Sequence, residues 1–461
     1  MYPSKSSDSS MRFVLVASLM AMATGVVLAG TAEAASEERG QFRAACVKVD
    51  ITPDTPQWLQ GYGPRQSTAV HDRIYHRIAV LDDGTTTFCL VSTDICTISP
   101  SFYHDFCEKL ERQTQIRSDN FWWSTTHTHS APHVGPQDLA KLFAGTLGDR
   151  FSIQHDTAYW VSVADKLVHG IKEALSRLEH ARLGIVSSTA AANVNRRQRR
   201  ADGRTVLGVN PEGPADRQLG VFRLERPDGT LIGLIANYAI HGTALGGGNS
   251  LISGDVPGFA AQYVERSTGV PLLFINGAEG NVAPLHSVGA NLEDPRLKEY
   301  DTLLGERILV ANAAMGNTTA DVTLRVGKTF VETPRKAGLG WPDALADYSS
   351  LSADGTPQVR VPVYSLTINS DTVIWAAPLE LFCEMPLSIR AASPFADTFY
   401  FGPEETTSSF FFLRPVCLGR KSVLQLPQVL RHGGCEVGFG TVRKGRHIRL
   451  VSTFCKCCLR G

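Results

Sequence analysis

The chain of 461 residues lacks any excess of charge, any internal repeat and any nucleotide-binding motif. Lysine plus arginine and aspartate plus glutamate each number 45, so the formal net charge is zero. Charge therefore gives no reason to expect nucleic acid or a membrane as a partner. No GxGxxG or P-loop pattern stands between a predicted strand and a predicted helix, which argues against nucleotide binding.

Cysteine is missing from most of the chain. None of the ten cysteines lies between Cys107 and Cys383, and four of them follow residue 430. Proteins stabilised by a disulfide framework have cysteines at regular spacings through the fold. We therefore predict no such framework here, and at most one bridge among Cys46, Cys89, Cys96 and Cys107.

One long apolar run is present, and it lies near the N-terminus. Lys5 and Arg12 precede an apolar stretch of 18 residues that ends at Gly30, and the small-residue sequence Ala-Glu-Ala at 32–34 follows. This order is typical of a secretory signal, so we predict a signal peptide over residues 1–34 and an exported mature protein, whether secreted, periplasmic or at the cell surface. An uncleaved membrane anchor is the alternative, because 18 apolar residues are just long enough to span a bilayer.

The remaining chain predicts a mixed α/β (α+β) fold. Three hairpins are expected where two β-rich runs flank a turn, at residues 77–94, 220–238 and 361–378. Helices are expected between them, one capped by Ser99 and one capped by Asp156, each with apolar side chains at helical spacing. We predict a large mixed β-sheet covered by helices, with the active site at the strand ends.

Two histidine-bearing segments are the strongest functional signal. FWWSTTHTHSAPHVGP, residues 121–136, places three histidines after a β-prone run, and LIANYAIHGTAL places His241 after another. A buried imidazole is costly unless it has a partner, and a divalent metal uses several at once. In extended backbone His127 and His129 would point to the same side, whereas His133 falls in a Pro/Gly loop expected at the surface. The alternative for each is a core histidine with an ordinary hydrogen bond, but together they favour a metal-dependent hydrolase.

Eight short motifs in order resemble the catalytic domain of the neutral/alkaline non-lysosomal ceramidase family. The resemblance covers roughly residues 44–400, so we predict a ceramidase-like catalytic domain over 41–404. Members of that family are described as zinc amidohydrolases that cut the N-acyl bond of ceramide. The motifs are VKVDITP, GYGPR, HDRIYHRIAVLDD, VSTD, THTHSAP, NRR, NYAIHGTAL and FINGAEGNVAP.

The resemblance implies a ligand set for zinc. It makes His127 and His241 two ligands, and it assigns His129 a role lining the site, where it would pass a proton to the leaving amine. The segment AAPLELFCEMP resembles the family's PGE segment, which makes Glu380 the carboxylate ligand, although Leu379 replaces the glycine of that motif. Glu384, four residues on, is the rival.

Other residues follow from the same resemblance. A zinc ion lowers the pKa of bound water to about 7 and so supplies a nucleophile at neutral pH. Arg196, directly after Asn195, matches the family's site arginine and would stabilise the oxyanion, while the three arginines nearby would point outward into solvent or towards lipid headgroups. Asp94 ends a strand and is expected beside the site. The implied partner is a ceramide-like lipid amide, with peripheral membrane contact and no nucleic acid.

The chain also departs from the family pattern. Ala283 stands where ceramidases proper have a serine in the site, which excludes a serine nucleophile at that position but not water activated by zinc. The two family tyrosines downstream are missing, and Cys435 stands in the place of one. Residues 405–461 carry ten basic and two acidic residues with no periodicity, so we predict a divergent, frame-shifted tail without an immunoglobulin-like domain. These departures leave two alternatives open, a metallohydrolase of the same fold acting on another amide or ester, and a non-catalytic homologue with a degraded site.

Overall fold

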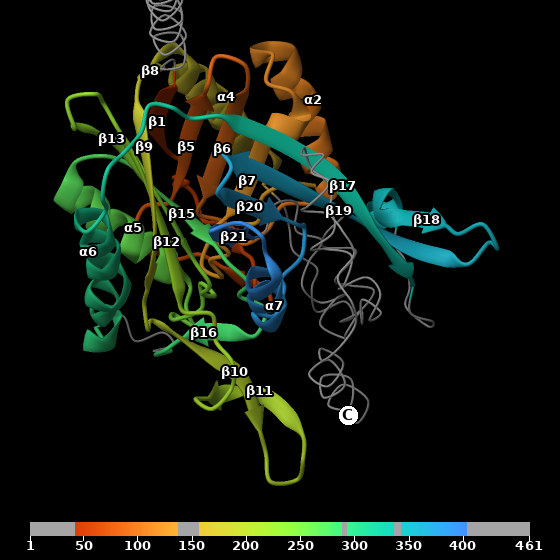
Figure 1. Ribbon diagram of the computed structural model, residues 1–461. Coiled ribbons are helices and arrows are strands. Elements are labelled where there is room, and N and C mark those ends of the chain that lie inside the picture. The colour runs from red at the N-terminus through yellow and green to blue at the C-terminus, as the bar shows by residue number, and fades with distance from the viewer. Residues whose placement is uncertain (1–41, 137–155, 288–292, 336–342, 403–461) are drawn as a thin grey trace, which may run out of the picture.

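The computed structural model describes residues 42–136, 156–287, 293–335 and 343–402 (Figure 1). The predicted signal peptide at 1–34 and the predicted tail at 405–461 lie outside the described residues. Among the described helices, none combines the length and the apolar character needed to cross a bilayer. The five described cysteines form no disulfide with one another, so the single bridge allowed among Cys46, Cys89, Cys96 and Cys107 is not formed.

The first layer is a five-stranded sheet in the order β7-β6-β5-β1-β8. Its inner strands are buried on both faces, and successive residues face opposite sides. Ile78 and Val80 of β5 pack under helices, whereas Ala79 and Leu81 pack against the other sheets. The strands are β1 (Arg43–Asp50), β5 (Tyr75–Asp82), β6 (Thr87–Thr93), β7 (Phe121–Thr125) and β8 (Glu179–His180).

Two helices cover the outer face of this sheet, as Figure 1 shows for the orange and yellow segments. Helix α2 (Pro100–Thr114) begins after Ser99, whose side chain accepts from the Phe102 backbone N–H at 3.3 Å. Helix α4 (Thr157–Ser176) begins after Asp156, which caps the Tyr159 N–H at 3.0 Å. Both predicted caps are confirmed, because each side chain supplies an acceptor that the first helical turn lacks.

The second layer is a four-stranded sheet in the order β15-β13-β12-β9. Strands β12 and β13 form the predicted antiparallel hairpin, and β15 returns parallel to β13 through helix α5. Helices α5 and α6 and a π-helical turn η4 pack on its outer face. The elements are β9 (Arg182–Thr189), β12 (Gln218–Glu225), β13 (Leu231–Tyr238), α5 (Asp255–Thr268), β15 (Leu272–Asn276), η4 (Asp301–Glu306) and α6 (Arg307–Ala313).

A third sheet contains β17, β19, β20 and β21 in that order, with β18 paired to β19. Its hairpin β19–β20 is also as predicted. One apolar core holds side chains from all three sheets, so the sheets pack face to face in the centre of the molecule. The elements are β17 (Leu324–Pro334), β18 (Ser349–Leu351), β19 (Pro357–Ile368), β20 (Thr372–Ala376), α7 (Glu384–Ala392) and β21 (Asp397–Phe401).

Short strands and turns complete the described part of the fold. Strand β10 (Asn193–Arg199) pairs with β11 (Thr205–Asn210) on one side and with β16 (Val282–Pro284) on the other. The remaining short elements are β2 (Trp58–Leu59), β3 (Arg65–Gln66), β4 (Ala69–Val70), η1 (Ser118–Asn120), β14 (Leu251–Ile252), η3 (Pro295–Leu297) and η5 (Asp343–Tyr348). The predicted mixed α/β class is confirmed, although the strands form several stacked sheets rather than one large sheet. The physical reason is that each sheet buries its inner face against another sheet as well as against helices.

Candidate metal centre

Three strand ends bring the candidate ligands together. His127 follows β7, His241 follows β13 and Glu380 follows β20, so each lies a few residues beyond the buried end of a strand. Thr128 and Gly242 form a parallel bridge, and the His129 N–H donates to the Gly242 carbonyl at 2.8 Å. A Cβ on Gly242 would stand 2.6 Å from the Thr128 Cα, so only glycine lets the two histidine segments approach this closely.

The three side chains converge in the interior, where each is at most 2% exposed. Nε2 of His127 lies 3.2 Å from Oε1 of Glu380, and Nε2 of His241 lies 3.9 Å from Oε2 of the same carboxylate. The two imidazole rings are 4.6 Å apart in an edge-to-face arrangement. One donor atom from each residue lies within 4.8 Å of the other two. The structure therefore places together the three residues that the sequence assigned to the metal.

The backbone of His127 differs from the extended conformation assumed from the sequence. Its φ is +57°, in the left-handed region that non-glycine residues rarely adopt. The strand β7 has already ended at Thr125, and the chain turns sharply before His129. His127 and His129 still face one site, but through this turn rather than through alternation along a strand. His133, expected at the surface, is instead buried at 7% exposure, because its loop folds back and its N–H donates to the Trp58 carbonyl at 2.9 Å.

A backbone contact orients His241. Its Nδ1 lies 2.9 Å from the carbonyl oxygen of Glu279 and donates to it, which leaves the lone pair of Nε2 facing Glu380. Such a contact on the far nitrogen is the usual way in which a metal-binding imidazole is fixed in one tautomer and one orientation.

The two carboxylates considered from the sequence lie in different surroundings. Glu380 is buried against both histidines. Glu384 begins helix α7, and its Oε2 accepts a hydrogen bond from the Asn281 side chain at 2.7 Å. Of the two, Glu380 is therefore the one in a position to share an ion with the imidazoles.

A second buried acid, Glu279, escaped the sequence reasoning. It is fully buried just after β15, and among the described residues neither carboxylate oxygen has a hydrogen-bond partner. Burial, reinforced by the nearby Glu380 carboxylate, raises the pKa of Glu279 well above its usual range. A sequence signal for Glu279 was available, because this acid closely follows an apolar strand that ends at Asn276. The same pattern, a polar side chain just beyond an apolar strand, singled out His241.

Arg196 reaches the same site from strand β10. Its Nη2 donates to the Gly280 carbonyl at 3.0 Å, and Arg197 donates to that oxygen at 3.3 Å. Two arginines of the cluster therefore turn inward rather than one. Burial lowers the pKa of Arg196, while the carboxylates of Glu380 and Glu279 raise it. The guanidinium keeps its charge in a site of low dielectric, since arginine is not deprotonated in proteins.

His129 lies beside the two candidate ligands. Its ring centroid is 5.0 Å from that of His127 and 5.3 Å from that of His241, and Tyr62 packs against it edge to face at 4.9 Å. Arg65 donates to the His129 carbonyl. Burial, followed by the charges of neighbouring groups, holds the pKa of His129 well below its ordinary value, so the ring is neutral at neutral pH.

The three remaining predicted site residues have other contacts. The Asp94 carboxylate accepts from Arg77 at 2.7 Å and from the Tyr75 N–H at 3.0 Å, so it belongs to a buried ion-pair network. The Asn195 side chain donates to the Pro214 carbonyl and accepts from the Arg197 N–H, each at 2.8 Å. These bonds hold the part of β10 that contains Arg196 and Arg197. Ala283 lies on β16 and is paired with Val194 of β10.

The donor set fits a divalent metal. Burial lowers the pKa of both His127 and His241, so each imidazole is neutral and offers a lone pair, and Glu380 adds a carboxylate. Two imidazoles and one carboxylate form a common protein donor set in catalytic zinc sites, where a fourth position stays open for water. The unpartnered oxygens of Glu279 are further buried acceptors in the same region.

Comparison with known proteins points to one family. Residues 42–287, more than half of the chain, match the model of the neutral/alkaline non-lysosomal ceramidase N-terminal region. Neutral ceramidase of Pseudomonas aeruginosa is 27% identical over 53% of this chain and 37% of its own length. Neutral ceramidase A of Dictyostelium discoideum is 28% identical over 55% of this chain, again 37% of its own length. The chain thus matches little more than a third of the length of these curated relatives.

Solved structures show the same fold. The crystal structure of neutral ceramidase from Pseudomonas aeruginosa superposes with a TM-score of 0.59 at 17% identity, covering 79% of this chain and 68% of that one. A ceramidase complexed with C2 superposes with a TM-score of 0.61 at 19% identity, covering 80% and 69%. The fold and the match over residues 42–287 lead to one conclusion: the chain belongs to the neutral/alkaline non-lysosomal ceramidase family.

Proposed function

We propose that this protein is a zinc-dependent amidohydrolase that cleaves the N-acyl bond of ceramide or a related lipid amide. The observation that carries the proposal is the convergence of His127, His241 and Glu380 at three buried strand ends, in a chain of this family. Relatives named neutral ceramidase, and a related structure named as a ceramidase complexed with C2, support this substrate class.

The chain's own residues would divide the work of hydrolysis. His127, His241 and Glu380 would hold the ion, which when bound supplies Lewis-acid activation of water near neutral pH. Arg196 would offer a fixed positive charge to the carbonyl oxygen as the tetrahedral intermediate forms. The neutral ring of His129 would take a proton from the attacking water and deliver it to the nitrogen of the leaving amine.

The precise substrate is a separate part of the proposal. Ala283 lies on β16, which pairs directly with the strand that carries Arg196, and it offers no hydroxyl group. A contact that a serine would make with a substrate is therefore missing at this position. That observation favours, as the second candidate, hydrolysis of a different amide or an ester by the same metal centre.

We also propose peripheral contact with a lipid surface through the β10–β11 hairpin, which projects from the body of the molecule in Figure 1. Leu207 and Val209 of β11 are 71% and 55% exposed, and Leu207 lies directly opposite Arg197 in the register. Residues 199–209 contain three exposed arginines and one acid, Asp202. Exposed apolar side chains among arginines complement an anionic bilayer, in which each basic residue contributes about 1 kcal/mol.

This hairpin lies next to the candidate centre. The Arg197 guanidinium stacks 4.9 Å from the ring centroid of Phe382, which is two residues from Glu380 and itself partly exposed. A bilayer docked on the hairpin would therefore bring its lipids close to the candidate metal ligands.

The N-terminal segment supports export of the mature chain, so the proposed site of action is outside the cytoplasm. If the signal is cleaved after Ala34, sequencing of the mature N-terminus should begin at Ala35.

The decisive experiment measures metal content and amide turnover together on the purified mature chain. We expect one equivalent of zinc and cleavage of a fluorescent ceramide, with both lost in His127→Ala and His241→Ala. Turnover of short-chain amides or esters without ceramide cleavage would establish the second candidate. Zinc bound with no turnover on any of these substrates would mean that the protein is a non-catalytic homologue.

A further inference from the structure

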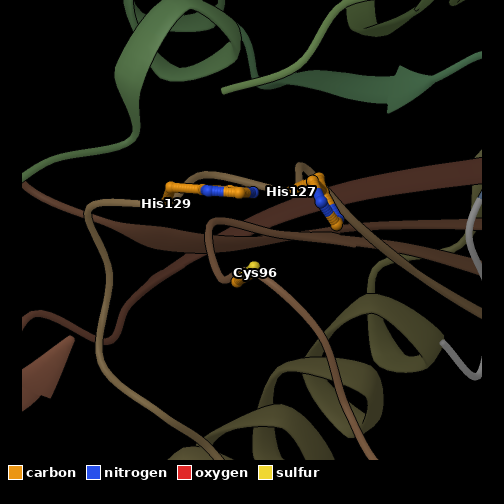
Figure 2. A group of neighbouring side chains, drawn as sticks. All are labelled: Cys96, His127 and His129. Atoms are coloured by element: carbon orange, nitrogen blue, oxygen red, sulfur yellow. The ribbon is translucent and has the colours of Figure 1, made fainter. Parts of the chain in front are cut away.

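A second group of potential metal ligands lies beside the first and shares His127 with it. Donor atoms of Cys96, His127 and His129 all lie within 4.8 Å of one another. Figure 2 shows the two imidazoles on one side of the group and the Cys96 sulfur pointing towards them from a separate loop. Cys96 is buried, forms no disulfide within the described part of the chain and lies between the end of β6 and the start of α2.

The histidine that completes this group has capacity for a ligand. Both ring nitrogens of His129 are shielded from water, and neither has a well-formed hydrogen bond among the described residues. The ring is held in place from behind, because a Cβ on Gly61 would meet its Cγ at 2.3 Å and Tyr62 packs against its edge. A fixed, shielded imidazole facing a thiol and a second imidazole is the arrangement of a soft-metal site.

We propose that Cys96, His127 and His129 form a second metal-binding position that excludes the first. Ligand atoms around a tetrahedral zinc ion lie about 3.3 to 3.8 Å apart, so small side-chain movements would close the present group around an ion. Binding would replace the S–H bond of Cys96 by a sulfur–metal bond and release the proton to solvent. The ion keeps its charge, and no oxidant or reductant is required.

Sharing of His127 makes the two positions alternatives. A neutral imidazole has one lone pair, so His127 cannot serve both ligand sets at the same time. The group that contains Cys96 contains neither His241 nor Glu380, so an ion held by the thiolate lies away from the carboxylate ligand. Thiophilic ions such as Cd²⁺ should prefer the sulfur position, whereas the oxygen and nitrogen donors of the other set suit zinc. The proposal rests on the chain binding a divalent metal, and not on amide hydrolysis.

The absorption spectrum of bound Co²⁺ tests whether Cys96 is a metal ligand. A thiolate ligand gives a sulfur-to-cobalt charge-transfer band, which nitrogen and oxygen ligands do not give. The metal-free full-length chain is titrated with Co²⁺ alongside Cys96→Ser and Cys96→Ala, two variants that guard against a folding defect in either one. Cys107→Ala is the matched control, since Cys107 is also buried and forms no disulfide among the described residues. Cysteines of residues 403–461 contribute equally to every variant, so the wild-type minus variant difference isolates Cys96.

We expect the charge-transfer band to lose intensity in both Cys96 variants and in His127→Ala, and to persist in Cys107→Ala and His241→Ala. Equal bands in wild type and in folded Cys96→Ser, checked by circular dichroism, would overturn the proposal. The band would also be inconsistent with it if it vanished in His241→Ala. Failure of the proposed function is recognised separately, as a wild-type chain that shows the Cys96 band but hydrolyses no amide.

Discussion

Nε2 of His127 and Oε1 of Glu380 lie 3.2 Å apart, with both side chains only 1% exposed. Two ligands on one tetrahedral zinc ion are separated by about 3.3 Å, so this pair already has the spacing that a shared ion requires. His241, at 3.9 Å from the other oxygen of Glu380, needs only a small further approach. Packing of the strand ends thus places the three side chains at a spacing that suits a shared ion.

Replacing Glu380 separates its role from that of Glu384. Glu380→Gln removes the anionic ligand, and we expect zinc affinity to fall more than about 100-fold, since loss of an outer partner alone costs about 10- to 100-fold. Glu384→Gln is the matched control, because that carboxylate bonds to Asn281 instead. Zinc dissociation constants measured by competition with a chelator check this. Equal losses in the two variants would show that Glu380 is not a ligand.

The buried network around Arg77 predicts a large effect on stability. Its guanidinium is fully buried and bonds to Asp94 and Glu265, each at 2.7 Å. Arg77→Met leaves the buried Asp94 without a cation and Glu265 with Lys48 alone, and loss of one partner of a buried pair costs about 3 to 5 kcal/mol. Arg73→Met removes an exposed pair with Asp50 and should cost far less, because solvent screens a surface ion pair. Urea unfolding gives the free energy of unfolding of each variant. Similar small decreases in that free energy would argue against a stabilising role for the network.

His76 gives the fold a defined pH dependence. Burial lowers its pKa to about 4 in the folded state, against an ordinary value of 6.5. Above pH 6.5 the ring is neutral in both states and its full contribution is present. Between pH 6.5 and 4 only the unfolded chain takes up the proton, so unfolding becomes easier as the pH falls, by at most about 3 kcal/mol.

A variant of His76 separates its contribution to the pH dependence of stability from those of the other titratable groups. His76→Gln cannot titrate, although it also loses the contacts of the ring with Thr93 and the Val163 carbonyl and so starts from a lower stability. The free energy of unfolding of the two chains should converge as the pH is lowered from 6.5 to 4. Parallel curves over that interval would mean that His76 keeps an ordinary pKa in the folded protein.

The sequence predicted those parts of the molecule that depend on local pattern. Hairpins, helix caps and the strand-end histidines follow from spacing and turn chemistry over a dozen residues or so, and Glu380 followed from a family motif. The positive φ of His127, the inward turn of Arg197 and the stacking of several sheets did not follow, because each is set by contacts between distant segments. Cys96 was missed as a ligand for the same reason, since a single cysteine gains meaning only from the neighbours that the fold gives it.

Membrane binding by the β10–β11 hairpin can be tested at Leu207, with an equally exposed leucine elsewhere as the control. Leu207 on the hairpin and Leu351 on β18 are both 71% exposed, but Leu207 lies opposite Arg197 in the register, whereas Leu351 lies opposite Pro357. We expect Leu207→Ser to weaken binding to vesicles of phosphatidylcholine and phosphatidylserine in a sedimentation assay, and Leu351→Ser to leave it unchanged. Burying a leucine side chain in the bilayer is worth about 1.5 to 3 kcal/mol, so the affinity for vesicles should fall about tenfold or more.

Hydrolysis of a substrate dissolved in detergent should be the same in wild type and both variants, because neither leucine touches the candidate ligands. Equal vesicle binding by all three chains would place the membrane contact elsewhere, and a fall in both variants would indicate apolar adhesion without a preferred face.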